Sequence, residues 1–184
     1  MSRMFRKIDI IFSLFGLLIS FPLLVVIYIL NGQSALFLQE RVGRNKVPFI
    51  LIKFRTLKQG TESVATHLLT PESVTRFGMF LRRSKLDELP QLWNVLIGDM
   101  SLVGPRPNLF NQKALIAERD ALSVYRVRPG ITGLAQINEI DMSTPELLAM
   151  TDAKMIKEMS IANYFRFIMK TLAGKGSGDR FGGG

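Results

Sequence analysis

The 184-residue chain contains no cysteine and only one histidine. The absence of cysteine excludes disulfides and thiolate metal sites. His67 cannot form a histidine cluster and lies in a polar segment, so we expect it to have no functional role. Acidic residues are also few, because 15 Asp and Glu oppose 24 Lys and Arg and leave a net charge of +9. Nucleic acid, an anionic lipid surface or a phosphate-rich substrate could each explain such a charge.

The chain also lacks the sequence patterns of several common enzyme classes. It has no P-loop, no glycine fingerprint of dinucleotide-binding domains, no Ser-His-Asp pattern and no internal repeat. Its basic residues are spread along the chain rather than gathered in one run with interleaved aromatic residues, which argues against nucleic acid as a partner. Hydrophobic residues make up 47% of the sequence, so a membrane segment is expected.

An uncharged run from Ile10 to Leu30 provides that segment. It is long enough to cross the hydrocarbon core of a bilayer as one helix. Pro22, near its middle, removes a helical hydrogen bond and favours a kink, and the hydroxyl group of Ser20 can bond a carbonyl of the preceding turn. A cleaved signal peptide is disfavoured because no small-residue cleavage pattern follows the run. A plain transmembrane anchor is the main alternative.

Basic residues on both sides of this run argue against a single crossing. They are Arg3, Arg6 and Lys7 before it and Arg41, Arg44 and Lys46 after it. Because basic residues prefer the cytoplasmic face, one crossing would leave one of these groups on the opposite side. We therefore predict a re-entrant helix–break–helix over residues 1–33, which enters and leaves the membrane on the same face. Residues 34–173 then form a cytosolic domain.

Alternating residues predict the first elements of that domain. Strands are expected over residues 35–42 and 47–56, joined as a hairpin by a turn. Lys53 then shares a face with Arg55, where both could meet an anionic group; a solvent-exposed edge lysine is the plainer alternative. A polar loop over residues 59–72 follows the hairpin, and a helix is expected over residues 74–86.

The C-terminal part of the chain is predicted to be mostly helical. A helix over residues 110–124 carries charged residues that we place on its outer side, namely Lys113, Glu118, Arg119 and Asp120. Residues 145–172 end in an apolar stripe at helical spacing, formed by Ile161, Tyr164, Phe165, Ile168, Met169 and Leu172. The stripe could face a core or lie on the bilayer as an interfacial helix, and both interpretations stay open. The glycine-rich tail, residues 174–184, is expected to be disordered.

The stretch from Lys85 to Pro107 carries the clearest chemical signal. Asp87 and Glu88 open a predicted short helix, with Pro90 in its first turn and Gly98 at its end. Adjacent carboxylates favour a hard cation, and basic residues nearby make a site for a phosphate-containing substrate plausible. These residues are Arg82, Arg83, Lys85 and Arg106, the last in a stiff Gly-Pro-Arg-Pro turn. The alternative is an ordinary helix start, where acids are favoured by the helix dipole.

The whole stretch is more specific than its parts. LDELPQLWNVLIGDMSLVGPRP, residues 86–107, closely resembles the signature of the bacterial sugar transferase family, the monotopic phosphoglycosyl transferases. Two further blocks resemble the family in the family's order, QERVGRNKVPFILIKFRTL at residues 39–57 and RPGITGLAQIN at residues 128–138. The resemblance covers most of the chain, from the N-terminal hydrophobic segment to about Thr171.

The resemblance implies a fold and an activity. The fold would be α+β, with a re-entrant membrane helix, a small β-hairpin and a mostly helical cytosolic domain bearing interfacial amphipathic helices. The activity would be transfer of a sugar-1-phosphate from a UDP-sugar to undecaprenyl phosphate, with release of UMP, at the cytoplasmic face of the bacterial inner membrane. The small form of the family resembles members that use N-acetylated amino sugars, although a plain hexose stays open. A homodimer through the C-terminal helix is a further expectation.

The resemblance also implies the roles of individual residues. Asp87 would be the nucleophile that forms a covalent aspartyl-phosphosugar and would bind Mg²⁺, and Glu88 would assist deprotonation of the lipid phosphate or hold the geometry of the pair. The phosphate charge would be held by Arg106, Arg82, Lys53 and Arg128. The membrane helix would break at a Ser-Pro pair, which this chain replaces by Ser20-Phe21-Pro22.

Two positions depart from the family's pattern. Met155 stands where a tyrosine is usual, and Tyr164 stands where an aspartate is usual. Two other functions stay open on the sequence. One is a Mg²⁺-dependent phosphodiesterase that hydrolyses the UDP-sugar, and the other is a basic module that binds a membrane surface without catalysis.

Overall fold

The computed structural model describes residues 3–58, 60 and 71–176. The loop around His67 and the tail from residue 177 therefore lie outside the described residues. The helices and strands are α1 (Arg3–Asn31), β1 (Leu36–Val42), β2 (Pro48–Phe54), α2 (Arg76–Arg83), α3 (Gln91–Ile97), β3 (Ser101–Val103), α4 (Lys113–Ala121), β4 (Gly130–Thr132), α5 (Leu134–Ile137), α6 (Pro145–Lys157) and α7 (Ile161–Leu172). Short 3₁₀ turns are η1 (Gly32–Ser34), η2 (Arg44–Lys46), η4 (Pro71–Ser73), η5 (Leu86–Glu88) and η6 (Val124–Arg126).

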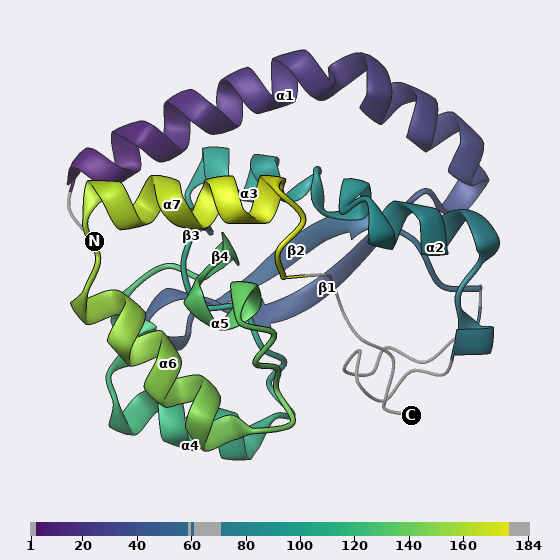
Figure 1. Cartoon of the computed structure of the whole chain (residues 1–184). Helices are drawn as coiled ribbons and strands as arrows, with labels where there is room; N and C mark the ends of the chain where they lie inside the picture. Colours follow the sequence, from purple (N-terminus) through teal and green to yellow (C-terminus); the bar gives the residue numbers. More distant parts are fainter. Residues whose placement is uncertain (1–2, 59, 61–70, 177–184) are drawn as a thin grey trace.

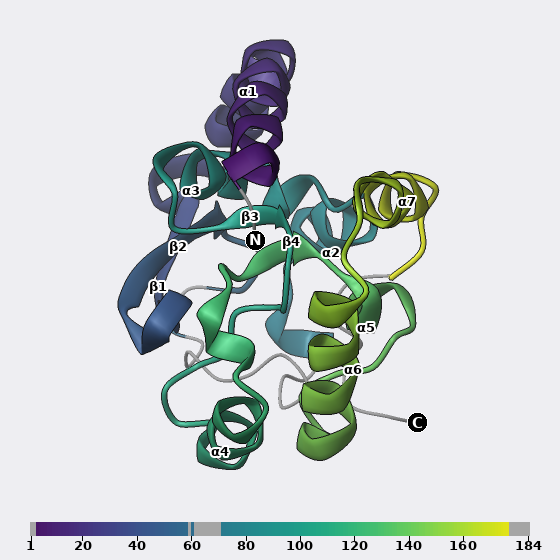
Figure 2. The same ribbon diagram turned by 90° about the vertical axis from the view of Figure 1, so that its left-hand side faces the viewer.

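The elements form an α+β arrangement, as predicted (Figure 1). Helix α1 lies along one side of the molecule, with α2, α3 and α7 beside it, and α4 and α6 lie at the opposite end (Figure 2). Two small sheets lie between them. Strands β1 and β2 form the predicted antiparallel hairpin, with Phe37 opposite Lys53, and β3 and β4 pair in parallel, with Ser101 opposite Gly130.

Helix α1 differs from the predicted helix–break–helix. It is one continuous helix of 29 residues with Pro22 inside it, and Figure 1 shows it as an arch. Pro22 has no N–H to donate to the preceding turn, and the Ser20 hydroxyl group donates to the Gly16 carbonyl at 2.6 Å. Both features bend a helix without ending it, so the predicted break is present only as a bend.

Both ends of α1 contact the same domain. Near its start, the Arg6 guanidinium donates to the carbonyls of Val95 and Leu96, at 2.5 and 2.8 Å. At its end, the Asn31 amide donates to the carbonyl oxygen of Arg55 at 2.8 Å. The middle of α1 exposes its apolar side chains, with Ile19 at 78% exposure. The helix is thus anchored at both ends, and one face of its first half also packs on the fold, where Ser13 is buried and the Phe12 ring contacts that of Phe165.

Two apolar clusters tie α1 to the domain. Near its start, Phe5 packs with Met100 and with Tyr164 and Phe167 of α7. Near its end, Ile27 packs in a separate cluster with residues of β2 and α2.

The predicted apolar stripe of α7 is divided between the core and the surface. Its Tyr164 is buried in the core. Other members of the stripe are exposed, namely Ile161 (45%), Met169 (62%) and Leu172 (76%).

Candidate active site

Asp87 and Glu88 lie in η5, a 3₁₀ turn that is separate from α3, which begins at Gln91. The prediction that they open this helix is therefore wrong. In an α-helix the N–H of residue 90 would donate to the Leu86 carbonyl, but Pro90 has no N–H. The N–H of Leu89 donates to that carbonyl instead, at 3.3 Å, which tightens the chain into a 3₁₀ turn.

The backbone on either side of this turn explains its position. Lys85 adopts a left-handed conformation, with φ at 57°, between the end of α2 and the start of η5. The turn leaves Asp87 6% exposed. Gly98, with φ at 103°, ends α3 as predicted. The two acids are thus held in a short, largely buried segment between two helices.

Arg106 reaches Glu88 from the Gly-Pro-Arg-Pro turn after β3. Its Nη2 donates to Glu88 Oε1 at 3.1 Å, in a pair whose side chains are 30% and 17% exposed. The turn packs closely on the chain before β4, since a Cβ atom at Gly104 would meet the Arg128 carbonyl oxygen at 2.5 Å. Glycine is therefore required at residue 104, and the turn aims Arg106 at the acids.

Two further residues predicted to hold phosphate charge, Arg82 and Lys53, come from α2 and β2. Arg82, 8% exposed, donates from Nε to the Thr56 hydroxyl oxygen at 2.8 Å. Helix α2 can approach Thr56 closely because Gly78 lies at the contact, where a Cβ atom would meet the Thr56 carbonyl oxygen at 2.2 Å. Lys53, in β2, and Arg55, just after its end, lie on the same face, as predicted, and both lie over the Phe37 ring, at 5.3 and 5.5 Å.

Lys85 responds to the charges of this site. Burial lowers the pKa of Lys85, the Glu88 carboxylate opposes that shift, and the Arg106 guanidinium adds to it. Its ammonium group also donates to the carbonyl oxygen of Lys175 at 2.6 Å. Lys85, Glu88 and Arg106 therefore form one electrostatic group.

Arg128 lies at the other end of α3. Its Nε donates to the Gly98 carbonyl oxygen at 2.6 Å, and it lines a hollow that also contains Arg6 and Asp9. Asp87 and Glu88 precede the start of α3, which as a seven-residue helix rises about 10 Å. Of the residues predicted to bind phosphate, Arg106 contacts Glu88 directly, and Arg128 lines a separate pocket.

Arg119 is a residue that the sequence reasoning missed. It was predicted on the outer side of its helix, but in α4 it is 1% exposed. Its Nη1 donates to the Arg106 carbonyl oxygen and to Asn108 Oδ1, both at 2.9 Å. Its Nε and Nη2 donate to Asp152 Oδ2, at 3.0 and 2.7 Å. The outer position was wrong because Asp152, on α6, neutralises Arg119 inside the fold.

Asp152 is enclosed with Arg119. Burial raises the pKa of the Asp152 carboxyl group, and the neighbouring guanidinium of Arg119 opposes that shift. Within the part of the chain that the structure describes, Asp152 Oδ1 has no hydrogen-bond partner. The pair connects α6, through Arg119, to the backbone of the turn that carries Arg106. No local signal marks it, because its members are 33 residues apart.

The sequence matches the family described as Bacterial sugar transferase over residues 1–175. The chain belongs to the bacterial sugar transferase family. An uncharacterized sugar transferase of Haemophilus influenzae is 34% identical over 191 residues, which cover 91% of this chain and 40% of that protein. A UDP-glucose:undecaprenyl-phosphate glucose-1-phosphate transferase of Caulobacter vibrioides is 34% identical over 180 residues, which cover 91% of this chain and 67% of the relative.

A third relative comes from Bacillus subtilis. It is provisionally named an undecaprenyl-phosphate N-acetylgalactosaminyl 1-phosphate transferase, and it is 44% identical over 116 residues, which cover 59% of this chain and 65% of the relative. The chain thus spans less than half of the Haemophilus protein and under two thirds of the Bacillus protein.

The Mg²⁺ that the resemblance implies can be compared with the metal donors that this chain offers. Within residues 3–58, 60 and 71–176, no group of three or more His, Cys, Asp or Glu side chains could hold a metal ion. Asp87 and Glu88 provide a two-carboxylate donor set. Mg²⁺ is often held by one or two carboxylates together with substrate phosphates, so this donor set fits Mg²⁺ that binds with a phosphate substrate.

The two departures from the family's pattern are buried. The Met155 sulfur accepts a hydrogen bond from the Leu134 N–H at 3.1 Å. The Tyr164 hydroxyl group donates to Asp9 of α1 and lies 3.3 Å from the Ser101 hydroxyl oxygen. Both residues thus contribute to the packing of the fold, since each is at most 1% exposed.

Proposed function

We propose that this chain transfers a sugar-1-phosphate from a UDP-sugar to undecaprenyl phosphate and releases UMP. The observation that carries the proposal is the largely buried Asp87, next to a Glu88 that Arg106 holds at 3.1 Å, in a member of the sugar transferase family. The Caulobacter relative's name states the same reaction type. Both substrates carry phosphates, and the basic residues around the acids suit their charge.

The first step would form a covalent intermediate on Asp87. A carboxylate oxygen of Asp87 attacks the β-phosphorus of the UDP-sugar and forms a new P–O bond. The bond from that phosphorus to the oxygen that bridges the two phosphates breaks, and UMP leaves with the electron pair. The sugar-1-phosphate then remains on Asp87 as an acyl phosphate. Arg106 and Arg82 hold the phosphate charge that shifts toward the leaving group.

The second step would regenerate Asp87. A phosphate oxygen of undecaprenyl phosphate attacks the same phosphorus, and the bond to the Asp87 oxygen breaks. The product is a sugar joined to the lipid through a diphosphate. Glu88 accepts the proton of the lipid phosphate where that group carries one, and the ion pair with Arg106 fixes the orientation of Glu88. Mg²⁺, held by Asp87 with the substrate phosphates, would supply charge neutralisation at the diphosphate.

Helix α1 would hold the protein in the membrane as a re-entrant segment. Both of its ends contact one domain, through Arg6 and Asn31, and its apolar middle is exposed. A helix that crossed the bilayer would place its ends on opposite faces, about 30 Å apart. The proposal therefore places the domain on the cytoplasmic face of the bacterial inner membrane, where it meets the lipid substrate.

The donor we propose is a UDP-linked N-acetylated amino sugar. The Bacillus relative, 44% identical over the matched residues, is named for N-acetylgalactosamine. Other relatives are named for glucose or galactose, so the donor must be decided by a panel.

The test is UMP release by the purified chain in detergent. The assay contains Mg²⁺, undecaprenyl phosphate and a panel of UDP-sugars, and it compares the wild type with Asp87→Asn. Asp120→Asn is the matched control, because it makes the same chemical change at a side chain that is 53% exposed. We expect release by the wild type and by Asp120→Asn, and a loss of about a thousandfold or more in Asp87→Asn.

Two arms separate the alternatives. Without the lipid acceptor, a covalent route gives one burst of UMP and a sugar-labelled protein, whereas sustained UMP release with free sugar phosphate would show hydrolysis by water. No UMP from any donor, with lipid binding unchanged in Asp87→Asn, would favour a membrane-binding module without catalysis.

A further inference from the structure

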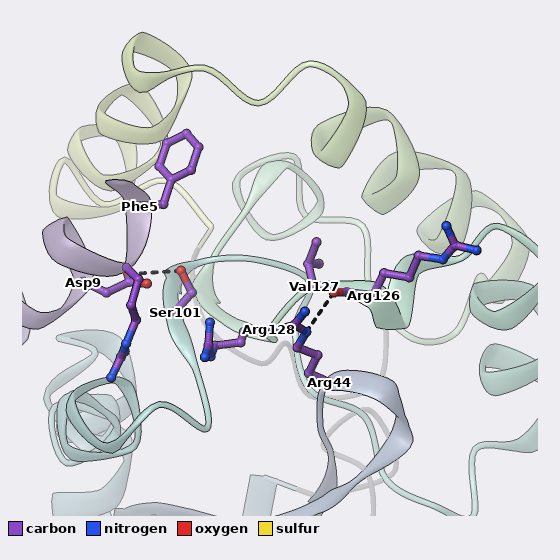
Figure 3. A pocket seen from close by; sticks show the side chains of 8 residues that line it. Phe5, Asp9, Arg44, Ser101, Arg126, Val127 and Arg128 are labelled. Atoms are coloured by element: carbon purple, nitrogen blue, oxygen red, sulfur yellow. Dashed lines mark hydrogen bonds between the residues drawn. The ribbon is translucent and has the colours of Figure 1, made fainter. Parts of the chain in front are cut away.

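A hollow lined by arginines lies beside the first turns of α1 (Figure 3). It is open to solvent, and the space at its mouth, which includes that solvent, measures about 290 Å³. Its basic lining residues are Arg6, Arg44, Arg126 and Arg128. Among the described residues that line it, Asp9 is the one acid. We call this hollow the arginine pocket.

Backbone carbonyls hold three of these arginines in place. Arg6 donates to two carbonyls near the end of α3, and Arg128 donates to the Gly98 carbonyl oxygen. Arg44 Nε donates to the Arg126 carbonyl oxygen at 3.0 Å. In Figure 3 the side chain of Arg126 extends away from Arg44 and Arg128, so it lies at the rim. The charges of the pocket itself come from Arg6, Arg44 and Arg128.

These charges exceed the negative charge available to them. The Asp9 carboxylate already accepts, at Oδ1, from the Ser101 hydroxyl group, the Leu102 N–H and the Tyr164 hydroxyl group. Burial lowers the pKa of Arg128, and the charges of Arg6 and Arg44 lower it further. An anion in the pocket would remove this repulsion, and guanidinium groups bind phosphate oxygens in a geometry that matches them.

The position of the pocket indicates where the anion comes from. Phe5, Arg6 and Asp9 line it from the start of α1, and the exposed apolar side chains of that helix follow at Ile10 and Ile11. If the apolar part of α1 enters the bilayer, the pocket lies at the depth of the lipid headgroups. It also lies at the opposite end of α3 from Asp87 and Glu88.

We propose that the arginine pocket binds a phosphate group, supplied by an anionic phospholipid of the bilayer around α1. The bound headgroup would be a second contact between the start of α1 and the membrane, separate from the reacting acids. A soluble phosphate compound has the same recognition chemistry, so the test includes both sources.

The test measures binding of fluorescent phosphatidylglycerol to the full chain in mixed micelles of a neutral detergent, with phosphatidylcholine as the neutral lipid. The variant is Arg44→Gln, and the matched control is Lys46→Gln, which removes the same charge from another exposed residue of η2 that does not line the pocket. Circular dichroism confirms that both variants are folded. Inorganic phosphate and UMP are added as competitors. The assay contains no UDP-sugar, so its result does not depend on the transferase proposal.

We expect Arg44→Gln to weaken phosphatidylglycerol binding by about fivefold or more, the effect of one basic charge at an anionic membrane surface. Lys46→Gln should bind close to the wild type, and neither soluble compound should compete. Competition by inorganic phosphate or UMP that is lost in Arg44→Gln would overturn the lipid as the source and assign the pocket to a soluble phosphate. Equal binding by Arg44→Gln and Lys46→Gln would overturn the pocket as a phosphate site.

Discussion

Single side chains in this fold are linked through charges that are only partly exposed. Glu88 stabilises the charged form of Lys85, and Arg106, which is paired with Glu88, disfavours it. A substrate phosphate that drew Arg106 toward itself would therefore change the pKa of Lys85 as well. The acids, the arginine and the lysine respond to a ligand together, which is the property required of a site that neutralises phosphate charge.

Tyr164 gives a residue-scale prediction that concerns stability. Burial, together with the negative charge of Asp9, raises the pKa of Tyr164 well above its ordinary value of 10.0. Its hydroxyl group therefore remains a donor to Asp9. Because the folded-state pKa is raised, this stabilisation is complete below the unfolded-state value and is lost as pH rises through the range above 10.0.

We expect Tyr164→Phe to lower the free energy of unfolding at neutral pH by about 1.5–3 kcal/mol, as for a hydrogen bond to a charged group. The difference from the wild type should narrow above pH 10.0. Urea unfolding in detergent across this pH range is the measurement. Tyr28→Phe is the control, since Tyr28 is 54% exposed. A difference that stays constant at high pH would contradict the proposed coupling to Asp9.

At the scale of elements, α4 and α6 support the turn that carries Arg106. The Arg119–Asp152 pair joins the two helices, and Arg119 also donates to the Arg106 carbonyl oxygen. Asp152→Asn should destabilise the fold by about 3–5 kcal/mol, because it leaves a buried guanidinium without its counter-charge. Chemical unfolding of the variant measures this loss.

The control for that prediction is Asp120→Asn, on α4, the helix that also carries Arg119. Asp120 pairs with Lys46 at 2.9 Å, but both side chains are about half exposed, at 53% and 48%. Exposed pairs contribute at most about 1 kcal/mol, so this variant should unfold close to the wild type. Equal losses in the two variants would show that the Arg119–Asp152 pair has no special part in the fold.

The elements also show how far local sequence patterns reach. Alternation and turn residues located the β1–β2 hairpin, and Gly98 marked the end of α3, because these features depend on neighbouring residues. The burial of Arg119 depends on Asp152, which is far along the chain, and a charged residue in a helix otherwise indicates solvent. The separate turn at Asp87 follows from the missing N–H of Pro90, because proline is compatible both with the first turn of a helix and with a break before it.

At the site, the structure brings Glu88 and Arg106 into contact, whereas Arg128, which the resemblance groups with them, lies beyond α3. Residues near each other in sequence motifs need not share a pocket when a helix lies between them. Arg6 shows the converse, because it precedes Arg128 by most of the chain and lines the same hollow. Such pairings follow from the way α1 returns to the domain, which local periodicity does not encode.

The whole molecule is organised by the way α1 meets the domain. Arg6 near its start and Asn31 at its end are both hydrogen-bonded to that domain, and α1 arches between them (Figure 1). A single crossing would need one of these anchors to detach, together with its apolar cluster around Phe5 or Ile27. Because each cluster buries apolar surface, detaching either costs free energy, and the proposed re-entrant topology would keep both.

The chain's lack of cysteine makes this topology directly testable. In separate variants, Arg3→Cys introduces a thiol at the first residue of α1 and Lys46→Cys introduces one beyond its end, both at exposed positions. In a re-entrant protein, a membrane-impermeant maleimide should label both variants in inverted membrane vesicles and neither in intact spheroplasts. Leu18→Cys, in the exposed apolar middle of α1, is the control and should react only after detergent is added. Labelling of Arg3→Cys and Lys46→Cys from opposite sides would instead establish a spanning helix, and the contacts of Arg6 or Asn31 with the domain could not then persist in the membrane.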